Sequence, residues 1–176
     1  NAHPSVGVLA LMQVAGIEGK TITISDLVFK IGPRINATGR MKSGAEAVRL
    51  LITEDEEEAR QYAQDINAYN QDRREYDTRT KEEALAQLEA DPDNDKKYTT
   101  VVYSPHWHKG VVGIAASRLT ETYYRPTIVL TAGENGIISG SARSVSDFDI
   151  YAAIDSCRDL VTNFGGHRFA AGLSMH

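Results

Sequence analysis

The sequence is poor in the features that mark secreted, disulfide-bonded and membrane-spanning proteins. It has a single cysteine, Cys157, which excludes an internal disulfide and a zinc site built from cysteines. No apolar run is long enough to cross a bilayer, and the first residues lack the pattern of a signal peptide. We therefore expect a cytoplasmic protein with no membrane partner. We expect Cys157 to lie within a helix and to pack in the core rather than to act as a nucleophile.

Positive charge is also scarce overall, but it is unevenly placed. The net charge of −5 argues against a non-specific polycation. Acidic residues gather at 54–58 and 91–95, whereas arginines stand close to glycines at 34, 40, 143 and 168. This pattern allows a locally basic site on an acidic protein. The sequence has 176 residues and begins with asparagine rather than methionine, so we expect it to be a piece of a longer protein.

Hydrophobic spacing and turn residues predict the order of the elements. Helices are expected at 1–15, 45–52, from Thr53 to about residue 90, 111–122 and from Asp147 or Asp149 to about 162. Residues 29–41 read as a loop or a broken helix, because Gly32 and Pro33 interrupt them. Strands are expected at 98–103, 127–131, 137–144 and 171–175.

The predicted fold class is α/β, with a long helix as its central feature. Apolar and aromatic residues recur every three or four positions from Ala59 to Leu88, which is too long for an ordinary globular helix. This helix therefore bridges two domains or braces one. The predicted division is a helical interdomain segment at 1–52 with a Gly-Pro-Arg loop, a long bridging helix and turn at 53–95, and a small α/β domain with a mixed sheet at 96–176.

Residues 163–174 combine glycines with a histidine. Gly165 and Gly166 remove side chains where the backbone must turn or approach a ligand, and His167 follows at once. Exposed backbone N–H groups beside His167 would suit a phosphate. The alternative is a helix stop followed by a strand at the edge of the core, with His167 merely packed. The residues alone favour neither.

A second donor-rich stretch is 139–144. Alternation along a strand places Ser139, Ser141 and Arg143 on one face, and Ser144 adds a further hydroxyl group. Hydroxyl and guanidinium donors with little bulk favour a phosphate pocket. The alternative is a polar edge strand.

Two further stretches could also contact phosphate oxygens. Arg34, Asn36 and Arg40 offer guanidinium and amide donors, although an interdomain loop whose arginines pair with acids is slightly favoured. His108 stands just before the predicted helix 111–122, whose first N–H groups are free to bind an anion. A metal site from His106 and His108 is not expected. Metal-assisted hydrolysis needs clustered Asp and His ligands, and no such cluster is visible, so these residues could hold a phosphate backbone but not cut it.

Four motifs in order resemble a known family. Residues 108–119, 140–144 and 165–172 closely resemble the DHH-associated domain of DHH-superfamily phosphodiesterases, and residues 32–40 with the long helix resemble the RecJ family of single-strand-specific 5′-to-3′ DNA exonucleases. The resemblance covers essentially the whole chain. It implies that 96–176 is a DHH-associated substrate-binding domain. It also implies that manganese or magnesium is held by a separate N-terminal domain, so that this chain holds no metal and is inactive alone.

The resemblance also implies roles for single residues. Arg40, Ser141 and Arg143 would bind substrate or a terminal phosphate, and His167 would approach the scissile phosphate in an assisting catalytic role. Arg34, Asn36 and His108 are weaker candidates, and Ser144, Gly165 and Gly166 complete the predicted set. The implied partner is single-stranded DNA, with a single-strand-binding protein as a further one, in DNA repair and recombination.

Two alternatives stay open. One keeps the fold but acts on very short RNAs (nanoRNA) or cyclic dinucleotides, against which the run at 32–40 and the long helix speak. The other is a non-catalytic interaction module that keeps the fold only as a protein-binding surface.

Overall fold

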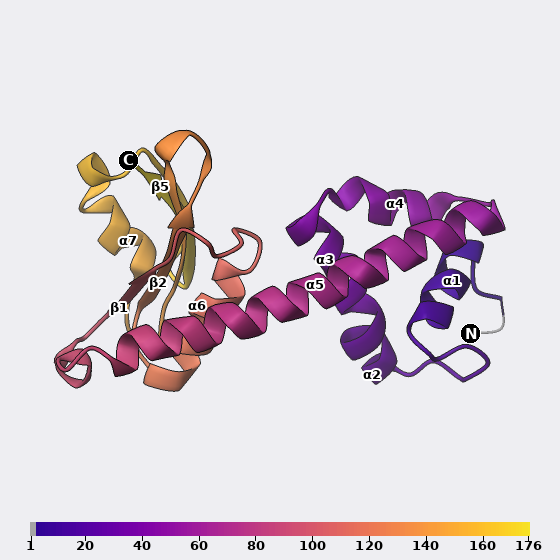
Figure 1. The fold of residues 1–176 in the computed structure, drawn as a ribbon, viewed down its shortest axis with the longest axis horizontal. Coiled ribbons are helices and arrows are strands. Elements are labelled where there is room, and N and C mark those ends of the chain that lie inside the picture. The colour runs from indigo at the N-terminus through magenta and orange to yellow at the C-terminus, as the bar shows by residue number, and fades with distance from the viewer. Residues whose placement is uncertain (1–2) are drawn as a thin grey trace. The chain divides into compact units, whose positions relative to one another are not determined.

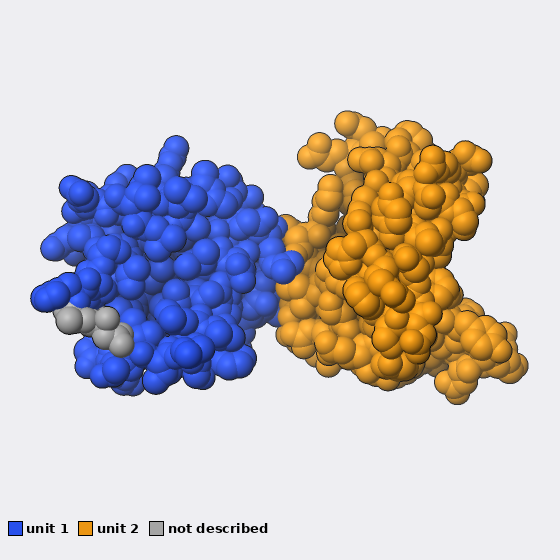
Figure 2. All heavy atoms as spheres, turned by 180° about the vertical axis from the view of Figure 1, so that it is seen from behind, with its two compact units in different colours: residues 1–75 blue, residues 76–176 orange. Residues whose placement is uncertain are grey.

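The computed structural model describes residues 3–176, which fall into two compact units (Figure 2). Unit 1 ends at Glu75 and unit 2 covers Tyr76–His176. The first two positions of the predicted helix 1–15 lie outside the described residues. The boundary between the two units lies within the long helix, so it does not test the predicted three-part division, which stays a prediction.

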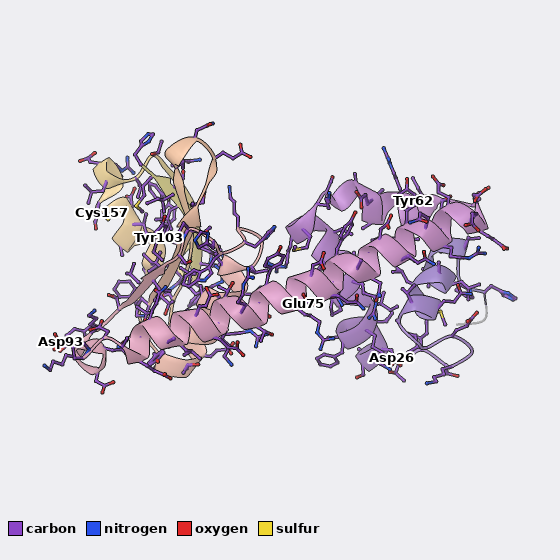
Figure 3. All side chains as sticks on the ribbon, viewed as in Figure 1. Asp26, Tyr62, Glu75, Asp93, Tyr103 and Cys157 are labelled. Atoms are coloured by element: carbon purple, nitrogen blue, oxygen red, sulfur yellow. The ribbon has the colours of Figure 1, made fainter. Side chains whose placement is uncertain are left out.

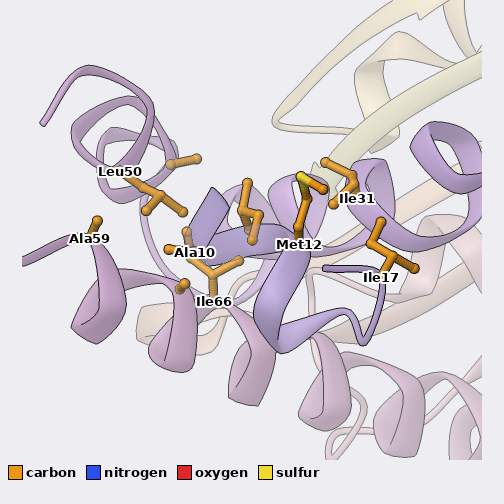
Figure 4. Packing of buried hydrophobic residues seen from close by; sticks show 10 residues of the cluster. Ala10, Met12, Ile17, Ile31, Leu50, Ala59 and Ile66 are labelled. Carbon is orange, nitrogen blue, oxygen red and sulfur yellow. The ribbon is translucent and has the colours of Figure 1, made fainter. Parts of the chain in front are cut away.

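Unit 1 is helical. Its elements are α1 (Val6–Val14), α2 (Ile24–Asp26), the π-helical turn η1 (Leu27–Ile31), α3 (Gly32–Met41), α4 (Gly44–Ile52) and the first part of α5 (Glu56–Glu89). Leu11, Leu50 and Ile66, from three different helices, are fully buried in its core (Figure 4). α1 and α4 can pack closely because Gly7 has no side chain. A Cβ at this position would lie 1.8 Å from the carbonyl oxygen of Leu50 and would clash with it.

Residues 29–41 are helical, so the loop expected there is wrong and the broken helix is correct. η1 leads straight into α3 at Gly32, and Pro33 stands in the first turn of α3. The π-helical turn η1 is an irregularity in the helix that directly precedes the Gly-Pro pair.

The long helix α5 is a continuous helix of 34 residues, as predicted. It begins at Glu56 rather than at Thr53, and Oδ1 of Asp55 accepts the hydrogen bond from the Glu58 N–H at 2.8 Å. Ala63 and Ile66 lie in the core of unit 1, whereas Ala84 and Leu88 lie in a core of unit 2. One helix therefore supplies residues to both units.

Unit 2 contains a five-stranded mixed sheet, which confirms the predicted α/β class (Figure 1). The strands are β1 (Thr100–Tyr103), β2 (Thr127–Ala132), β3 (Ile138–Arg143), β4 (Asn163–His167) and β5 (Ala170–Met175). Their order is β1-β2-β3-β5-β4, in which only the β1–β2 pair is parallel. Helix α6 (Val112–Tyr123) packs over β2 and β3, and α7 (Ile150–Asp155) packs against β4 and β5.

The two faces of this sheet have separate cores. On one face Val102 and Val129 pack with Ala115 and Leu119 of α6. On the other face Ala142, Ala171 and Leu173 pack with residues of α7. Three short helical turns complete the part of the chain that the structure describes: η2 (Asn94–Lys96), η3 (Glu134–Gly136) and η4 (Arg158–Leu160).

The C-terminal stretch from Asp149 onward corrects three expectations. Asp149 caps α7 as predicted, with Oδ1 accepting from the Ala152 N–H at 3.0 Å, but α7 ends at Asp155 rather than near 162. The Gly-Gly-His stretch is not a turn before the final strand but part of β4, a strand that the sequence pattern did not predict. Cys157 follows α7 and is exposed, so its expected place in the core is wrong (Figure 3).

Candidate functional site

The strand register brings two of the predicted stretches onto one face of the sheet. Ser141 pairs with Gly172, which pairs with Gly165, and Arg143 pairs with Ala170, which pairs with His167. Residues directly opposite one another in a sheet point to the same side. Strands lie about 4.8 Å apart, so the Cα atoms of Arg143 and His167 are about 10 Å apart across β5. We call this surface the polar face, defined by Ser139, Ser141, Arg143, Gly165, His167, Gly172 and Ser174.

Arg143 is held in place by its neighbours. Its Nε donates to Oγ of Ser117 at 3.2 Å, and its Nη1 donates to Oγ of Ser141 at 2.9 Å and to the carbonyl of Ala142 at 2.7 Å. Ser117 in turn donates to the carbonyl oxygen of Gly113 at 3.1 Å. A guanidinium fixed in this way is already oriented for an anion, because little side-chain entropy remains to be lost on binding.

Gly113 lets α6 lie close over this arginine. A Cβ at position 113 would lie 3.0 Å from Nη2 of Arg143 and 3.0 Å from Oγ of Ser141. Any larger residue would therefore displace the two side chains. Neither Gly113 nor Ser117 was among the site residues predicted from the sequence. The four-residue spacing of Gly113 and Ser117, which places both on one side of a helix, was the signal that could have identified them.

The two adjacent glycines of β4 point to opposite faces of the sheet and have different roles. Gly166 has a φ of 153°, and a Cβ there would lie 2.2 Å from the carbonyl oxygen of Ala170. Gly165 is exposed, and a Cβ there would have no other atom within 4 Å. The strand therefore requires glycine at 166 for its own backbone, whereas Gly165 leaves open space beside Gly172.

Two histidines are oriented by the same local contact. Nδ1 of His167 accepts from the Phe169 N–H at 3.2 Å, and Nδ1 of His108 accepts from the Gly110 N–H at 3.0 Å. In each neutral ring the proton is therefore assigned to Nε2, which can donate outward. His167 is exposed at the end of β4. His108 lies just before α6 and contacts the ring of Tyr76, with the ring centroids 5.2 Å apart.

Two of the predicted residues make hydrogen bonds that stabilise the fold. Ser144 lies beyond the end of β3, and its hydroxyl group donates to the carbonyl of Phe148 at 2.8 Å. Arg34 donates to Oδ1 of Asn67 at 2.9 Å, and also to the carbonyls of Lys30 at 2.7 Å and Val14 at 3.3 Å. Its burial, with a smaller contribution from the nearby Arg74, lowers the pKa of the Arg34 guanidinium. The arginine thus joins helices of unit 1.

Asn36 and Arg40 belong to unit 1, and both are exposed on α3. They stand four residues apart, so they share one side of the helix. The amide group of Asn36 and the guanidinium group of Arg40 therefore lie on the same side of α3. The other predicted contacts, Ser141, Arg143, His108, Gly165 and His167, all belong to unit 2.

The residues of the polar face do not fit a divalent metal ion. Among the described residues, no group of three or more His, Cys, Asp and Glu side chains is arranged to hold one. The polar face offers a guanidinium, hydroxyl groups and one imidazole, which suit an anion better than a hard cation. Within residues 3–176, no helix has the length and apolar character needed to span a membrane.

Comparisons with known proteins show which family this chain resembles. Residues 95–176 match the model of the DHHA1 domain. The single-stranded-DNA-specific exonuclease RecJ of Dickeya dadantii (strain 3937) is 40% identical over 176 residues, which is 96% of this chain and 30% of that protein. The protein of the same description from Escherichia coli (strain K12) is 38% identical over 176 residues, with 96% and 30% covered. The chain spans about a third of the length of these curated relatives.

Solved structures show the same similarity. A crystal structure of RecJ in complex with Mn²⁺ from Thermus thermophilus superposes with a TM-score of 0.83 at 32% identity, covering 99% of this chain and 25% of that one. A crystal structure of exonuclease RecJ bound to manganese gives a TM-score of 0.86 at 32% identity, covering 99% and 42%.

Proposed function

Because this chain belongs to the RecJ family over the region that it spans, we propose that it is the substrate-binding part of an exonuclease that degrades single-stranded DNA from the 5′ end. The names of the relatives support the substrate and the reaction class. The direction of digestion rests on the motifs at 32–40 and in the DHHA1 domain.

The observation that carries this proposal is the oriented guanidinium of Arg143. Arg143 and Ser141 present donors side by side, and Ser117 holds the arginine from α6. A phosphate oxygen facing them would receive charge-assisted hydrogen bonds, which are about twice as strong as neutral ones. We assign Arg143 and Ser141 to grip a phosphate of the strand, at its 5′ end or within its backbone.

The remaining predicted residues take graded roles in this proposal. His167 points its Nε2–H toward the scissile phosphate, and the backbone at Gly165 and Gly166 allows the strand to approach. Asn36 and Arg40 in unit 1, and His108 in unit 2, keep the phosphate-binding roles that the family resemblance implies for them. Arg34 and Ser144 keep the hydrogen bonds within the protein described above.

The titles of the structural relatives name Mn²⁺ and Mg²⁺. We propose that the parent protein uses such an ion for hydrolysis and holds it with residues outside this chain. The part of the reaction that belongs to this chain is to bind and position the phosphate backbone, which can contribute several kcal/mol to the lowering of a barrier. A cytoplasmic location, a role in DNA repair and recombination, and an association with single-strand-binding protein complete the proposal.

Binding of a 5′-phosphorylated oligodeoxythymidylate, followed by fluorescence anisotropy in the presence of a chelator, tests the phosphate grip. We expect Arg143→Gln to weaken binding by tenfold or more, since a lost charge-assisted hydrogen bond costs about 1.5–3 kcal/mol. Arg158→Gln is the matched control, because Arg158 is an exposed arginine of the same unit that pairs with Asp155. Unchanged binding and unchanged activity of the parent carrying Arg143→Gln would instead support an interaction module.

A further inference from the structure

Unit 2 has an open pocket of about 840 Å³ between the loop before α6 and the turn that joins β2 to β3. Its lining includes Tyr76, His106, His108, Lys109, Ser139 and Ser174. Glu134 is the single acidic residue among its described lining residues. The volume lies within the range of small-molecule sites, and the walls combine flat rings with cationic and hydroxyl donors. Such a mixture suits a ligand that has both a ring and a phosphate.

The flat groups of this wall form a fixed column. The ring centroids of Tyr76 and His108 are 5.2 Å apart with an angle of 30° between their planes, and the guanidinium carbon of Arg79 lies 5.3 Å from the Tyr76 centroid. The His108 ring is also fixed by a hydrogen bond, in which its Nδ1 accepts from the Gly110 N–H. A phosphate alone does not stack on aromatic rings, whereas a nucleobase does.

The floor of the pocket is continuous with the polar face. Ser139 and Ser174 are directly paired in the β3–β5 register, and both belong to the polar face. Ser141 stands two residues further along β3, which is about 6.7 Å at the usual rise of a strand. A phosphate held at Ser141 and Arg143 therefore lies next to the opening that contains the Tyr76–His108 pair.

We propose that this pocket receives a nucleobase of the bound single strand, which stacks against the His108–Tyr76 pair while its phosphate contacts Ser141 and Arg143. Stacking of this kind accepts any base, because every base has a flat aromatic face. The pocket thereby makes the site selective for an unpaired strand, whose bases are free to turn out. This inference rests on the proposed function and adds a base-binding subsite to it.

The test compares two 5′-phosphorylated oligonucleotides of equal length, one of thymidylates and one with abasic residues throughout. Anisotropy is measured in a chelator with this chain, residues 1–176. The wild type is expected to bind the thymidylate strand about tenfold more tightly than the abasic strand, in line with one stacked base. Tyr76→Leu is expected to lose most of this ratio, by weakening only the thymidylate complex. Tyr76→Phe keeps the ring and is expected to keep the ratio.

Tyr98→Leu is the matched control, because Tyr98 is a 90% exposed tyrosine of the same unit outside the pocket. It is expected to leave the ratio unchanged. The inference is overturned if the abasic strand binds the wild type as tightly as the thymidylate strand, or if Tyr76→Leu weakens both complexes equally. In either case, weaker binding of the 5′-phosphorylated strand by Arg143→Gln would still support the proposed function. If the wild type binds neither strand, the proposed function fails and takes the subsite with it.

Discussion

Among single residues, Gly166 is a position at which the backbone of β4 is strongly constrained. Its φ of 153° is unfavourable for any side chain, and a Cβ would lie 2.6 Å from Cα of Ala171 as well as 2.2 Å from the carbonyl oxygen of Ala170. The backbone of β5 cannot move away without breaking its pairing with β3. Glycine is therefore a structural requirement at 166, apart from any contact with a ligand.

We predict that Gly166→Ala lowers the free energy of unfolding by about 2 kcal/mol or more, as expected for strain combined with a steric clash. The neighbouring Gly165→Ala is the matched control and is expected to change stability by less than about 0.5 kcal/mol, since open space surrounds that position. Urea unfolding of the two variants measures the difference. Equal stabilities would contradict the role given to the Gly166 backbone.

The same two glycines show what residue-level reasoning could and could not find. The sequence predicts a close approach of the backbone at Gly165 and Gly166, and the structure has one at Gly166, onto β5. The alternation of side chains along 139–144 places Ser141 and Arg143 on one face, which the side-chain contacts confirm. The spacing of Gly113 and Ser117 was a signal for a shared side of α6, but the contact of Ser117 with Arg143 depends on how α6 lies across β3.

At the scale of elements, a capping box formed by Thr23 and Asp26 fixes the start of α2, which leads into the π-helical turn η1. The Thr23 side chain accepts from the Asp26 N–H at 3.2 Å, while the Asp26 carboxylate accepts from the Thr23 N–H at 3.1 Å and from Lys30 at 2.7 Å (Figure 3). The hydrogen bonds from Lys30 and Thr23 hold the pKa of the Asp26 carboxyl group well below its usual range. A carboxyl group with a lowered pKa stabilises the folded state above its unfolded pKa of about 3.9.

We predict that Asp26→Asn destabilises the chain at pH 7 and that its difference from the wild type shrinks steadily as the pH falls below about 3.9. The sign follows because the wild-type carboxylate then loses its advantage as the unfolded chain takes up a proton first. Unfolding midpoints at pH 7, 4 and 3 measure the difference. Lys30→Met removes the largest contribution to the lowered pKa of Asp26. It is expected to destabilise the chain at pH 7 as well, but by less than Asp26→Asn. A difference that stays constant with pH would refute this account of the cap.

The sequence pattern did not predict strand β4, because several residues of this strand have low strand propensity. Glycine has low strand propensity, and Asn163 and the Gly165–Gly166 pair read as a turn rather than as a strand. The strand forms because every residue of β4 has a direct partner in β5, from Asn163 opposite Ser174 to His167 opposite Ala170. Pairing with a neighbour outweighs local propensity, and no local pattern could have revealed it.

At the scale of the whole molecule, the division of labour follows from which residues the chain brings together. Unit 2 gathers Arg143, Ser141, Ser117 and His167 into a surface rich in hydrogen-bond donors, and the described residues hold no cluster of metal ligands. Such a surface suits a phosphate backbone better than a divalent ion. Under the proposed function, this chain binds the strand and the metal-dependent step takes place on residues outside it.

We predict that this chain alone binds a 5′-phosphorylated oligodeoxythymidylate but does not shorten it in the presence of Mn²⁺. Gel electrophoresis of the end-labelled strand, with and without chelator, measures any shortening. Full-length parent protein with the same strand is the positive control. Robust degradation by the pure chain that a chelator abolishes would show that the chain holds the metal itself.

The sequence by itself determined the α/β class, the long helix and most element positions, because hydrophobic period, glycine, proline and capping residues act over a few neighbours. It also determined which residue types could bind a phosphate, since that is a matter of side-chain chemistry. Only the tertiary structure decided which of them meet. The β3–β5–β4 register places His167 in the row of Arg143, and α6 brings Ser117 onto the same arginine. Contacts between residues far apart in sequence depend on the packing of the whole sheet, and no local stretch encodes them.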